Sequence, residues 1–163
     1  MRRFEIISKE QWDNDVADLH FIDASLPQYE DIKLPARATS KSAGYDLYSP
    51  IDASIMPGEQ VMIPSGLKVN MEDDDVMFII IRSSLGIKQG LSIPNQTGVI
   101  DADYYNNPDN EGHFWICLKN NTNKQYNIKK GDRISQAIFI KYGKVEDDKP
   151  IKESRGGGFG STN

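Results

Sequence analysis

The sequence has very little cysteine or histidine. Its 163 residues include one cysteine, Cys117, and two histidines, His20 and His113. A single thiol cannot form an internal disulfide or a zinc site built from several cysteines. The two histidines lie far apart, with no cysteine or carboxylate cluster to complete a metal site. We therefore expect chemistry that needs neither a disulfide nor a chelated transition metal.

The chain also has no apolar run long enough to span a bilayer. Its first residues, Met1-Arg-Arg-Phe-Glu5, are charged and lack the hydrophobic stretch of a secretory signal. We expect a cytoplasmic protein with no membrane contact. The formal net charge is −5, which argues against a nucleic-acid partner held by phosphate neutralisation.

Strand-like patterns dominate the rest of the chain, and its length suits one domain. Residues 76–81 form a short continuous apolar run, as expected of a strand buried on both faces. Residues 113–119 alternate, with Trp115 and Cys117 on the face opposite to the other apolar side chains. Residues 134–142 are another strand candidate. Turn signals occur at residues 56–58, 64–66, 120–123 and 130–132. The pattern predicts an all-β fold, either a sandwich or a jelly roll.

One helix is predicted near the start, over residues 8–19. Ser8 would be its N-cap, with Gln11 three residues further on, as in a capping box. We assign this helix to an N-terminal extension of about residues 1–33 within a β-domain of residues 1–150. Residues 151–163 would follow as a flexible, glycine-rich C-terminal arm.

Four internal segments contain residues suited to phosphate chemistry. They are Ala43-Gly-Tyr-Asp-Leu47, Ile81-Arg-Ser-Ser-Leu-Gly86, Asn95-Gln-Thr-Gly-Val-Ile-Asp-Ala-Asp-Tyr104 and Gly131-Asp-Arg-Ile-Ser-Gln136. An arginine followed by two hydroxyls suits a phosphate clamp. In an extended chain, Asp101 and Asp103 would point to one face, where paired carboxylates can activate water or hold a metal. None of the four segments is diagnostic when taken alone, because ordinary turns and structural carboxylates have the same composition.

The fifth segment is the end of the chain, Arg155-Gly-Gly-Gly-Phe-Gly-Ser-Thr-Asn163. Glycine lets a backbone approach phosphates closely, and Arg155 offers a planar charged group for phosphate oxygens. Phe159 has a ring that can stack on a base. The same composition is typical of a dispensable flexible tail.

In this order and at this spacing, the five segments resemble the five motifs of the homotrimeric dUTPases, over about residues 34–163. The resemblance implies a distorted jelly-roll β-barrel and a homotrimer whose active sites are each shared by three subunits. It implies hydrolysis of dUTP to dUMP and pyrophosphate, with Mg²⁺ brought in on the substrate triphosphate. That activity keeps uracil out of DNA and supplies dUMP for thymidylate synthesis.

The resemblance also implies a role for each residue. Asp101 would be catalytic and would hold the attacking water, whereas Asp103 would be structural. Asp46 would reach Mg²⁺ only through water. Tyr104 would lie against the deoxyribose and leave no room for a 2′-hydroxyl. The implied substrate-binding residues are Arg82, Ser83, Ser84 and Gln136 for the phosphates, Asn95, Gly98, Val99 and Ile100 for uracil, Tyr104 for the sugar, and Arg155, Phe159, Gly160, Ser161 and Thr162 in the arm.

Three features depart from the family pattern. Ser84 stands where the family usually has glycine. Arg155 and Phe159 are four residues apart, whereas the family often has five. After Tyr104, this chain inserts residues 105–112, to which the resemblance gives no role.

Two alternatives stay open at this point. A dCTP deaminase shares the fold, but its chemistry needs a general-base glutamate beside the pyrimidine amino group, and residues 95–104 contain no glutamate. A protein of this fold can also serve mainly to bind a regulatory protein partner, through residues 105–111 or the N-terminal helix. We prefer dUTP hydrolysis because the catalytic and arm segments are intact.

Overall fold

The computed structural model describes residues 1–17, 19 and 27–150. Strands dominate this part of the chain, so the predicted all-β fold is confirmed. The C-terminal arm, residues 151–163, lies outside the described residues, and so do Arg155, Phe159, Gly160, Ser161 and Thr162.

Over the described residues, the elements follow one another as short strands with four short helices between them. The strands are β1 (Arg3–Ile6), β2 (Ala36–Arg37), β3 (Tyr45–Tyr48), β4 (Ala53–Ile55), β5 (Gln60–Pro64), β6 (Leu67–Asn70), β7 (Asp75–Ile81), β8 (Leu91–Ser92), β9 (Gly98–Asp101), β10 (Trp115–Asn120), β11 (Tyr126–Ile128) and β12 (Arg133–Lys141). The helices are α1 (Lys9–Val16), η1 (Tyr29–Asp31), η2 (Ser84–Lys88) and η3 (Ala102–Tyr104). No helix within the described ranges is long and apolar enough to cross a membrane.

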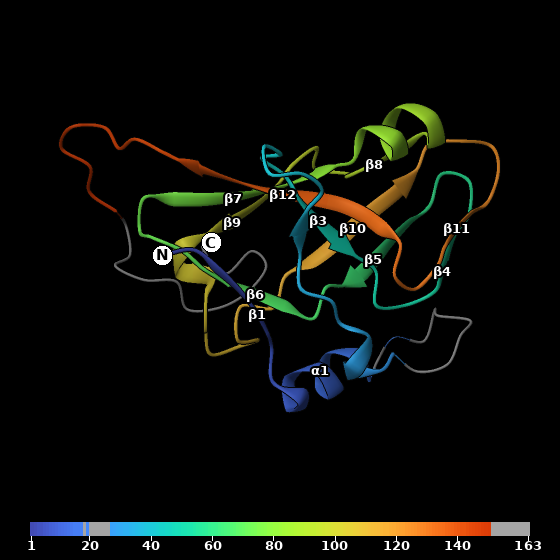
Figure 1. Cartoon of the computed structure of the whole chain (residues 1–163), viewed down its shortest axis with the longest axis horizontal. Coiled ribbons are helices and arrows are strands. Elements are labelled where there is room, and N and C mark those ends of the chain that lie inside the picture. The colour runs from blue at the N-terminus through green and yellow to red at the C-terminus, as the bar shows by residue number, and fades with distance from the viewer. Residues whose placement is uncertain (18, 20–26, 151–163) are drawn as a thin grey trace.

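In the part of the chain that the structure describes, the strands form four antiparallel sheets (Figure 1). The largest sheet has the order β2-β3-β12-β7-β9, and the others are β5-β10-β8, β1-β6 and β11-β4. In the largest sheet, Gln136 of β12 lies between Asp46 of β3 and Ile80 of β7. At the other end of β7, Val76 pairs with Asp101 of β9. This register positions the candidate site residues.

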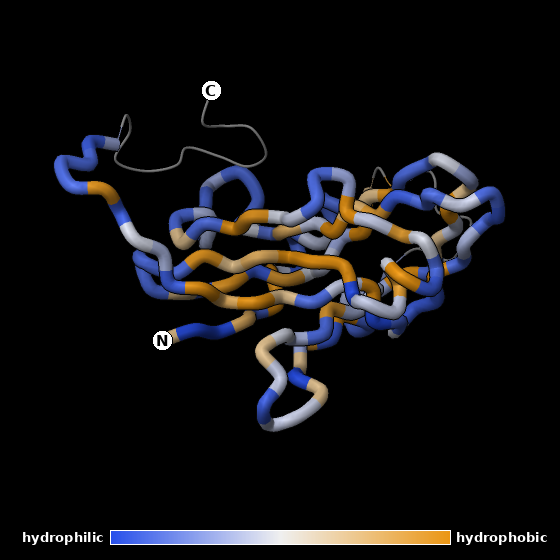
Figure 2. Tube along the Cα trace, turned by 90° about the horizontal axis from the view of Figure 1, so that it is seen from above, coloured by the Kyte–Doolittle hydropathy of each residue, from blue (hydrophilic) through white to orange (hydrophobic). Residues whose placement is uncertain are grey.

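Strand β7 covers the predicted apolar run at residues 76–81. Met77 and Ile79 face the core, where they are 0% and 3% exposed. Phe78 and Ile80 alternate with them and are only half-buried. Burial on both faces is thus observed only in part, because within one chain the outward face of this sheet stays partly open. Figure 2 shows hydrophobic residues along the strands and hydrophilic residues in the loops.

Strand β10 confirms the predicted alternation. Ile116 and Leu118 are 1% and 0% exposed and belong to the core. Trp115 and Cys117 lie on the opposite face and are half-buried. The period of two in a strand sends successive side chains to opposite faces. The two half-buried side chains are therefore available to line a cavity.

Three of the predicted turns contain a glycine in the left-handed region, at Gly58, Gly66 and Gly131. Gly66 has φ +71°, and a Cβ there would lie 2.5 Å from Cδ1 of Ile32. Gly131 has φ +87° in the turn that leads into β12. A side chain strains the backbone in this left-handed region, whereas glycine does not.

The N-terminal helix begins as predicted and ends earlier. The Ser8 hydroxyl accepts the N–H of Gln11 at 3.1 Å, which confirms Ser8 as the N-cap. The helix ends at Val16 rather than at residue 19. The side chain of Gln11 donates to Asp15 instead of returning to Ser8. The N–H of Ser8 donates to Glu111 at 3.1 Å, so a distant carboxylate completes the cap.

A buried carboxylate at the start of β7 links the N-terminus to the largest sheet. Asp75 is 0% exposed and accepts a hydrogen bond from Nε of Arg2 at 2.8 Å. Hydrogen bonding to Arg2 lowers the pKa of Asp75, with help from Lys141 and against the effect of burial. A carboxyl group with a lowered pKa in the folded protein stabilises the fold above its ordinary pKa. That contribution is lost as the pH falls through the lowered value.

We predict that Asp75→Asn lowers the free energy of unfolding at pH 7 by about 1–3 kcal/mol, the range for hydrogen bonds to a charged group. The difference from the wild type should shrink below about pH 4, where the unfolded carboxyl becomes protonated. Denaturant unfolding at pH 7 and at pH 3 measures the difference in the free energy of unfolding. The exposed neighbour Asp73 provides the control variant Asp73→Asn, which should change little at either pH. An equal loss for Asp75→Asn at pH 7 and pH 3 would contradict the ion-pair explanation.

Candidate active site

Three of the sequence segments meet at one end of the largest sheet. Asp46 on β3 and Gln136 on β12 are register partners. Gln136 is also opposite Ile80, two residues before Arg82. Arg82 follows β7 directly and precedes η2. Side chains far apart in the sequence are therefore brought together by strand pairing.

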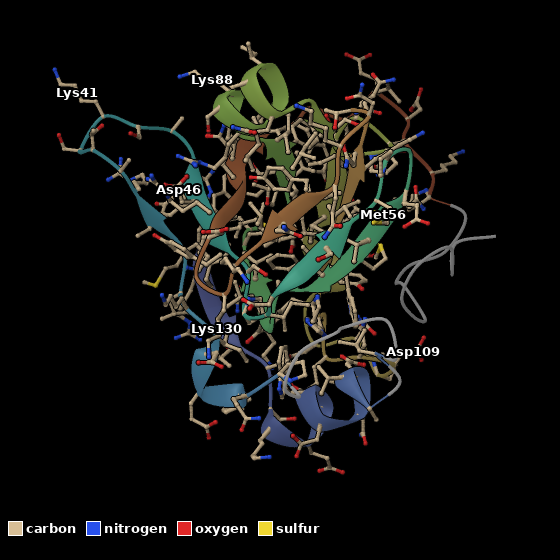
Figure 3. The ribbon with its side chains drawn as sticks, turned by 90° about the vertical axis from the view of Figure 1, so that its right-hand side faces the viewer. Lys41, Asp46, Met56, Lys88, Asp109 and Lys130 are labelled. Atoms are coloured by element: carbon tan, nitrogen blue, oxygen red, sulfur yellow. The ribbon has the colours of Figure 1, made fainter. Side chains whose placement is uncertain are left out.

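Asp46 is the centre of an ion-pair cluster. It is 7% exposed. Its Oδ1 lies 2.9 Å from Nε of Arg82, and its Oδ2 accepts from Nη1 of Arg133 at 3.1 Å. Arg133 was not among the predicted site residues, although the Gly131–Gln136 segment contains it. A buried carboxylate that accepts from two guanidinium groups fixes their orientation. In Figure 3, Asp46 lies nearer the body of the molecule than Lys41, which is at the tip of the neighbouring loop.

Gly44 makes room for Gln136. A Cβ at position 44 would lie 2.1 Å from Oε1 of Gln136, far inside van der Waals contact. The glycine two residues before Asp46 is thus required by a neighbouring side chain rather than by its own backbone angle. Ser83 and Ser84 are exposed at the start of η2, beside Arg82. Residues of the first, second and fourth segments therefore form one polar group.

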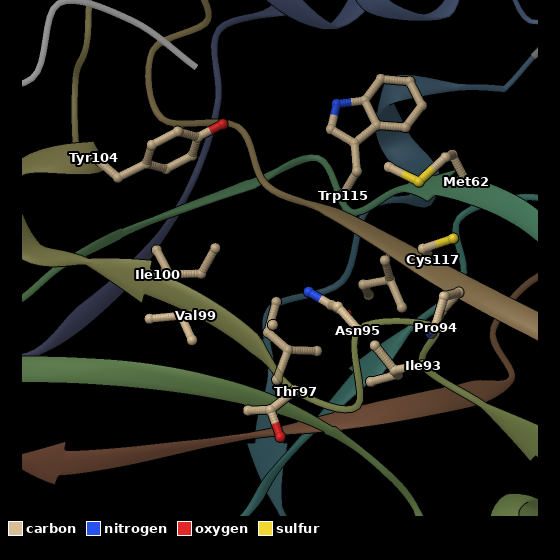
Figure 4. Close-up of a pocket in the computed structure, with 13 residues that line it drawn as sticks. Met62, Ile93, Pro94, Asn95, Thr97, Val99, Ile100, Tyr104, Trp115 and Cys117 are labelled. Atoms are coloured by element: carbon tan, nitrogen blue, oxygen red, sulfur yellow. The ribbon is translucent and has the colours of Figure 1, made fainter. Parts of the chain in front are cut away.

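A cavity of about 370 Å³ lies between strand β10 and the segment around β9 (Figure 4). Its lining residues are Met62, Ile79, Ile93, Pro94, Asn95, Thr97, Gly98, Val99, Ile100, Tyr104, Trp115, Ile116 and Cys117. Asn95, Gly98, Val99, Ile100 and Tyr104, which were predicted to contact uracil or the sugar, are among them. Phe159, which was predicted to stack on the base, lies outside the described residues. Met62, Trp115 and Cys117 were not predicted to be there. The alternation of residues 113–119 is the signal that could have found Trp115 and Cys117.

Strand β9 supplies backbone groups to this cavity. It is the edge strand of the sheet as described, so alternate N–H and C=O groups face away from β7. Gly98 pairs with Ile79, and a Cβ at Gly98 would lie 3.2 Å from Cβ of Ile79. The turn before it is tight, with the N–H of Gln96 donating to Ile93 at 2.8 Å. This arrangement can offer hydrogen bonds to the edge of a planar ring.

Tyr104 forms one wall of the cavity and is 6% exposed. Its hydroxyl donates to the carbonyl oxygen of His113 at 3.1 Å and accepts from Nδ2 of Asn110 at 2.9 Å. In Figure 4, Trp115 lies across the cavity from Tyr104, with Met62 and Cys117 beyond it. Burial raises the pKa of the Cys117 thiol, so this side chain stays protonated and apolar at neutral pH.

Asp101 lies at the end of β9, next to the lining residue Ile100. Within one chain it is far from the Asp46 cluster. Three strand spacings separate β3 from β9, or about 14 Å, and four residues along β7 add about 13 Å. The two groups of site residues are therefore roughly 19 Å apart. One chain assembles each group but does not bring them together.

No group of three or more histidine, cysteine or acidic residues in the described ranges is placed to hold a metal ion. The Asp46 carboxylate is already paired with two arginines. Mg²⁺ commonly keeps several waters and binds through substrate phosphates with one or two carboxylates. Among the described residues, Asp46 and its two arginines therefore suit an ion whose other ligands come from water and a phosphorylated molecule.

Comparison with solved structures identifies the fold. A dUTPase crystal structure from Streptococcus mutans superposes with a TM-score of 0.70 at 36% sequence identity, covering 88% of this chain and 98% of that chain. A mutant dUTPase from phage phi11 of S. aureus has a TM-score of 0.68 at 20% identity, covering 93% and 97%. The phage structure describes a structural Mg(II) ion in that protein. At 20% identity, the likeness concerns the fold alone.

Sequence comparison agrees with the fold. A family model described as dUTPase matches residues 30–163. The deoxyuridine 5′-triphosphate nucleotidohydrolase of Lactococcus lactis subsp. lactis is 46% identical over 132 residues, covering 80% of this chain and 88% of that relative. This chain belongs to the dUTPase family of enzymes.

We predict that Gly44→Ala moves the side chain of Gln136 and leaves the fold intact. The new methyl group meets the flexible end of a side chain, so the cost should be about 1 kcal/mol, or roughly 2–4 °C in Tm. A crystal structure of the variant should show Gln136 in another rotamer, with the Asp46–Arg82 pair kept. Gly143→Ala is the control, because nothing lies within 4 Å of a Cβ there. An unmoved Gln136 would contradict the close-contact argument.

Proposed function

We propose that this chain hydrolyses dUTP to dUMP and pyrophosphate. The observation that supports this most directly is the cavity, whose walls include the β9 segment and Tyr104 of the third motif. The family membership of the chain and the name of its L. lactis relative point to the same substrate. Hydrolysis of dUTP would keep uracil out of DNA and supply dUMP for thymidylate synthesis.

The cavity suits uracil recognition by backbone groups. Uracil presents an acceptor, a donor and an acceptor along its pairing edge, and edge strand β9 has free-facing N–H and C=O groups in alternation. Cytosine carries an amino donor where uracil has an oxygen, so a backbone donor would be left unpaired. The close walls at Gly98 and Val99 would leave little room for a 5-methyl group. Tyr104 would exclude a ribose 2′-hydroxyl in the same way.

The Asp46 cluster suits the triphosphate. Arg82, oriented by Asp46, would contact phosphate oxygens together with Gln136 and the hydroxyls of Ser83 and Ser84. Mg²⁺ bound to the triphosphate would reduce its negative charge, and Asp46 would reach that ion only through water. The local arginines explain how a chain of net charge −5 binds a polyanion.

Asp101 would activate the attacking water. Its carboxylate would accept a proton as the water oxygen attacks the α-phosphorus. The bond from the α-phosphorus to the bridging oxygen would break, and pyrophosphate would leave. No glutamate lies in residues 95–104 to act as the base for deamination of dCTP, so the hydrolase is the preferred function.

A homotrimer with shared sites would bring the two groups of residues together. The separation of roughly 19 Å between Asp101 and Asp46 is too large for one dUTP α-phosphate to meet both. The outward face of the largest sheet provides an apolar surface for a second copy. On this face Val99 is 55% and Ile140 is 43% exposed. They lie beside the half-buried side chains of Phe78, Ile80 and Ile138. The arm residues Arg155 and Phe159 would close the site from a third subunit. A cytoplasmic location and a regulatory protein partner stay predictions from the sequence.

Asp101→Asn should keep the shape of the site and lose the base. Turnover of dUTP should fall by about two or more orders of magnitude, as for removal of a general base. Binding of a non-hydrolysable dUTP analogue should change much less. Steady-state pyrophosphate release measures the first quantity and calorimetry the second. Asp103→Asn, two residues away and exposed, is the matched control and should stay within a few-fold of the wild type. Near-normal turnover in Asp101→Asn would exclude the proposed role.

Shared sites can be tested by complementation between two inactive variants. Asp101→Ala lacks the base and keeps Arg82, while Arg82→Ala lacks the phosphate contact and keeps Asp101. In randomly mixed trimers of cyclic symmetry, roughly a quarter of all sites should combine an intact Asp101 with an intact Arg82 of another subunit. Co-expressed chains should recover activity of that order, while each parent alone stays inactive. Verified mixed trimers without activity would contradict the shared-site arrangement but not the assignment of dUTP as substrate.

A further inference from the structure

The inserted segment 105–112 folds back onto Tyr104. The N–H of Asn106 donates to the carbonyl of Glu111 at 3.0 Å, and the N–H of Glu111 donates to Asn107 at 3.0 Å. Gly112, at φ +84°, approaches so closely that a Cβ there would lie 2.6 Å from the carbonyl oxygen of Tyr104. The segment is therefore a closed loop with Tyr104 at its base.

Two asparagines of this loop hold Tyr104 at both ends. Nδ2 of Asn107 donates to the backbone carbonyl of Tyr104 at 2.9 Å. Nδ2 of Asn110 donates to the Tyr104 hydroxyl at 2.9 Å and to the carbonyl of His113 at 3.1 Å. Oδ1 of Asn110 accepts from Asn107 at 2.8 Å and from the N–H of Gly112 at 3.1 Å. Asn110 thus connects the loop to the ring that forms the cavity wall.

The N-terminal extension binds the same loop through hydrogen bonds. Glu111 has a left-handed backbone at φ +57°, which is unfavourable for a residue with a side chain. Its carboxylate accepts the N–H and the hydroxyl of Ser8 and lies 3.2 Å from Nζ of Lys68. The Tyr105 hydroxyl donates to Glu5 of β1 at 2.9 Å. These contacts hold the loop against β1, β6 and the start of α1.

His113, whose carbonyl accepts the Tyr104 hydroxyl, is fixed from the same side. It is 0% exposed, and its Nε2 accepts the N–H of Gly66 at 2.9 Å. Its Nδ1 therefore bears the hydrogen and donates to Asp15 of α1 at 2.5 Å. The N-terminal extension therefore holds His113 directly, through Asp15, and holds Asn110 only through its neighbour Glu111.

We propose that Asn110 is a positioning residue for Tyr104, and that the loop 105–112, braced by the N-terminal extension, sets the discrimination against ribonucleotides. This inference rests on the proposed function, in which Tyr104 lies against the deoxyribose. Exclusion of the ribose 2′-hydroxyl requires that the Tyr104 ring stays in place. A small displacement of the ring would make room for the hydroxyl. Among the described residues, Asn110 supplies one of the two hydrogen bonds made by the Tyr104 hydroxyl at the far end of the ring.

Asn110→Ala should lower the ratio of kcat/KM for dUTP to kcat/KM for UTP by roughly five-fold, the effect of one hydrogen bond. The change should come mainly from a lower KM for UTP, with kcat for dUTP within about two-fold of the wild type. Asn127→Ala is the matched control. Asn127 on β11 also makes side-chain hydrogen bonds, to Ser54 and Gln125, and lies outside the cavity lining.

A double-mutant cycle separates positioning from loop stability. Tyr104→Phe removes the hydroxyl and leaves the contacts of Asn110 to Asn107 and Gly112 in place. Tyr104→Phe should lower the dUTP-to-UTP ratio of kcat/KM to a similar extent. Adding Asn110→Ala to Tyr104→Phe should then lower this ratio little further. Additive effects in the double variant, or an unchanged ratio in Asn110→Ala, would overturn the inference. Glu111→Ala should shift the ratio in the same direction, and no shift would overturn the part assigned to the N-terminal extension.

The two hypotheses fail in distinguishable ways. A wild-type chain that does not hydrolyse dUTP overturns both the proposed function and this inference. A wild-type chain that prefers dUTP strongly over UTP, with the same preference in Asn110→Ala, overturns the inference alone. A ratio that falls in Tyr104→Ala but not in Tyr104→Phe shows that the ring matters without its hydroxyl, which also counts against Asn110.

Discussion

The backbone ladder of β7 is the constraint on which the rest of this structure depends. β7 pairs with β12 on one side and β9 on the other. Its carboxyl end places Arg82 beside Asp46 and Gln136, and its amino end places Val76 opposite Asp101. Because strands are stiff and their register is fixed by the buried face, neither group can move toward the other. The distance between the two groups is a property of the sheet, and it makes a single chain an incomplete enzyme under the proposed function.

Positive charge is gathered locally around Asp46, although the molecule as a whole is acidic. The chain is acidic, with a net charge of −5, yet one buried carboxylate, Asp46, organises two arginines. A buried ion pair of this kind contributes orientation more than stability, since desolvation offsets much of the attraction. Tyr104 is held by the same principle with neutral groups, through amide donors of Asn107 and Asn110. In both places, the groups that would contact the ligand directly are oriented by residues that would not contact it directly.

Local features could be predicted from the sequence, whereas distant partners could not. Ser8 was identified as the N-cap because a cap depends on residues within one turn. The alternation along β10 was identified because it depends only on the period of a strand. The partner that completes the cap, Glu111, lies 103 residues away in sequence. Arg133 was overlooked for a similar reason, since its partner Asp46 is 87 residues away. The arm was assigned by resemblance and lies outside the described residues.

The sequence alone determined the all-β class, the turns at Gly66 and Gly131, and the five segments that identify the family. These depend on periodicity, on the backbone freedom of glycine and on short strings of residues, all of which are local. Only the tertiary structure decided that Asp46, Arg82 and Arg133 form one cluster, that Trp115 faces Tyr104 across a cavity, and that the segment 105–112 holds Tyr104. The physical reason is that strand register and loop closure join residues far apart in the chain, and no short-range pattern encodes which partners they meet.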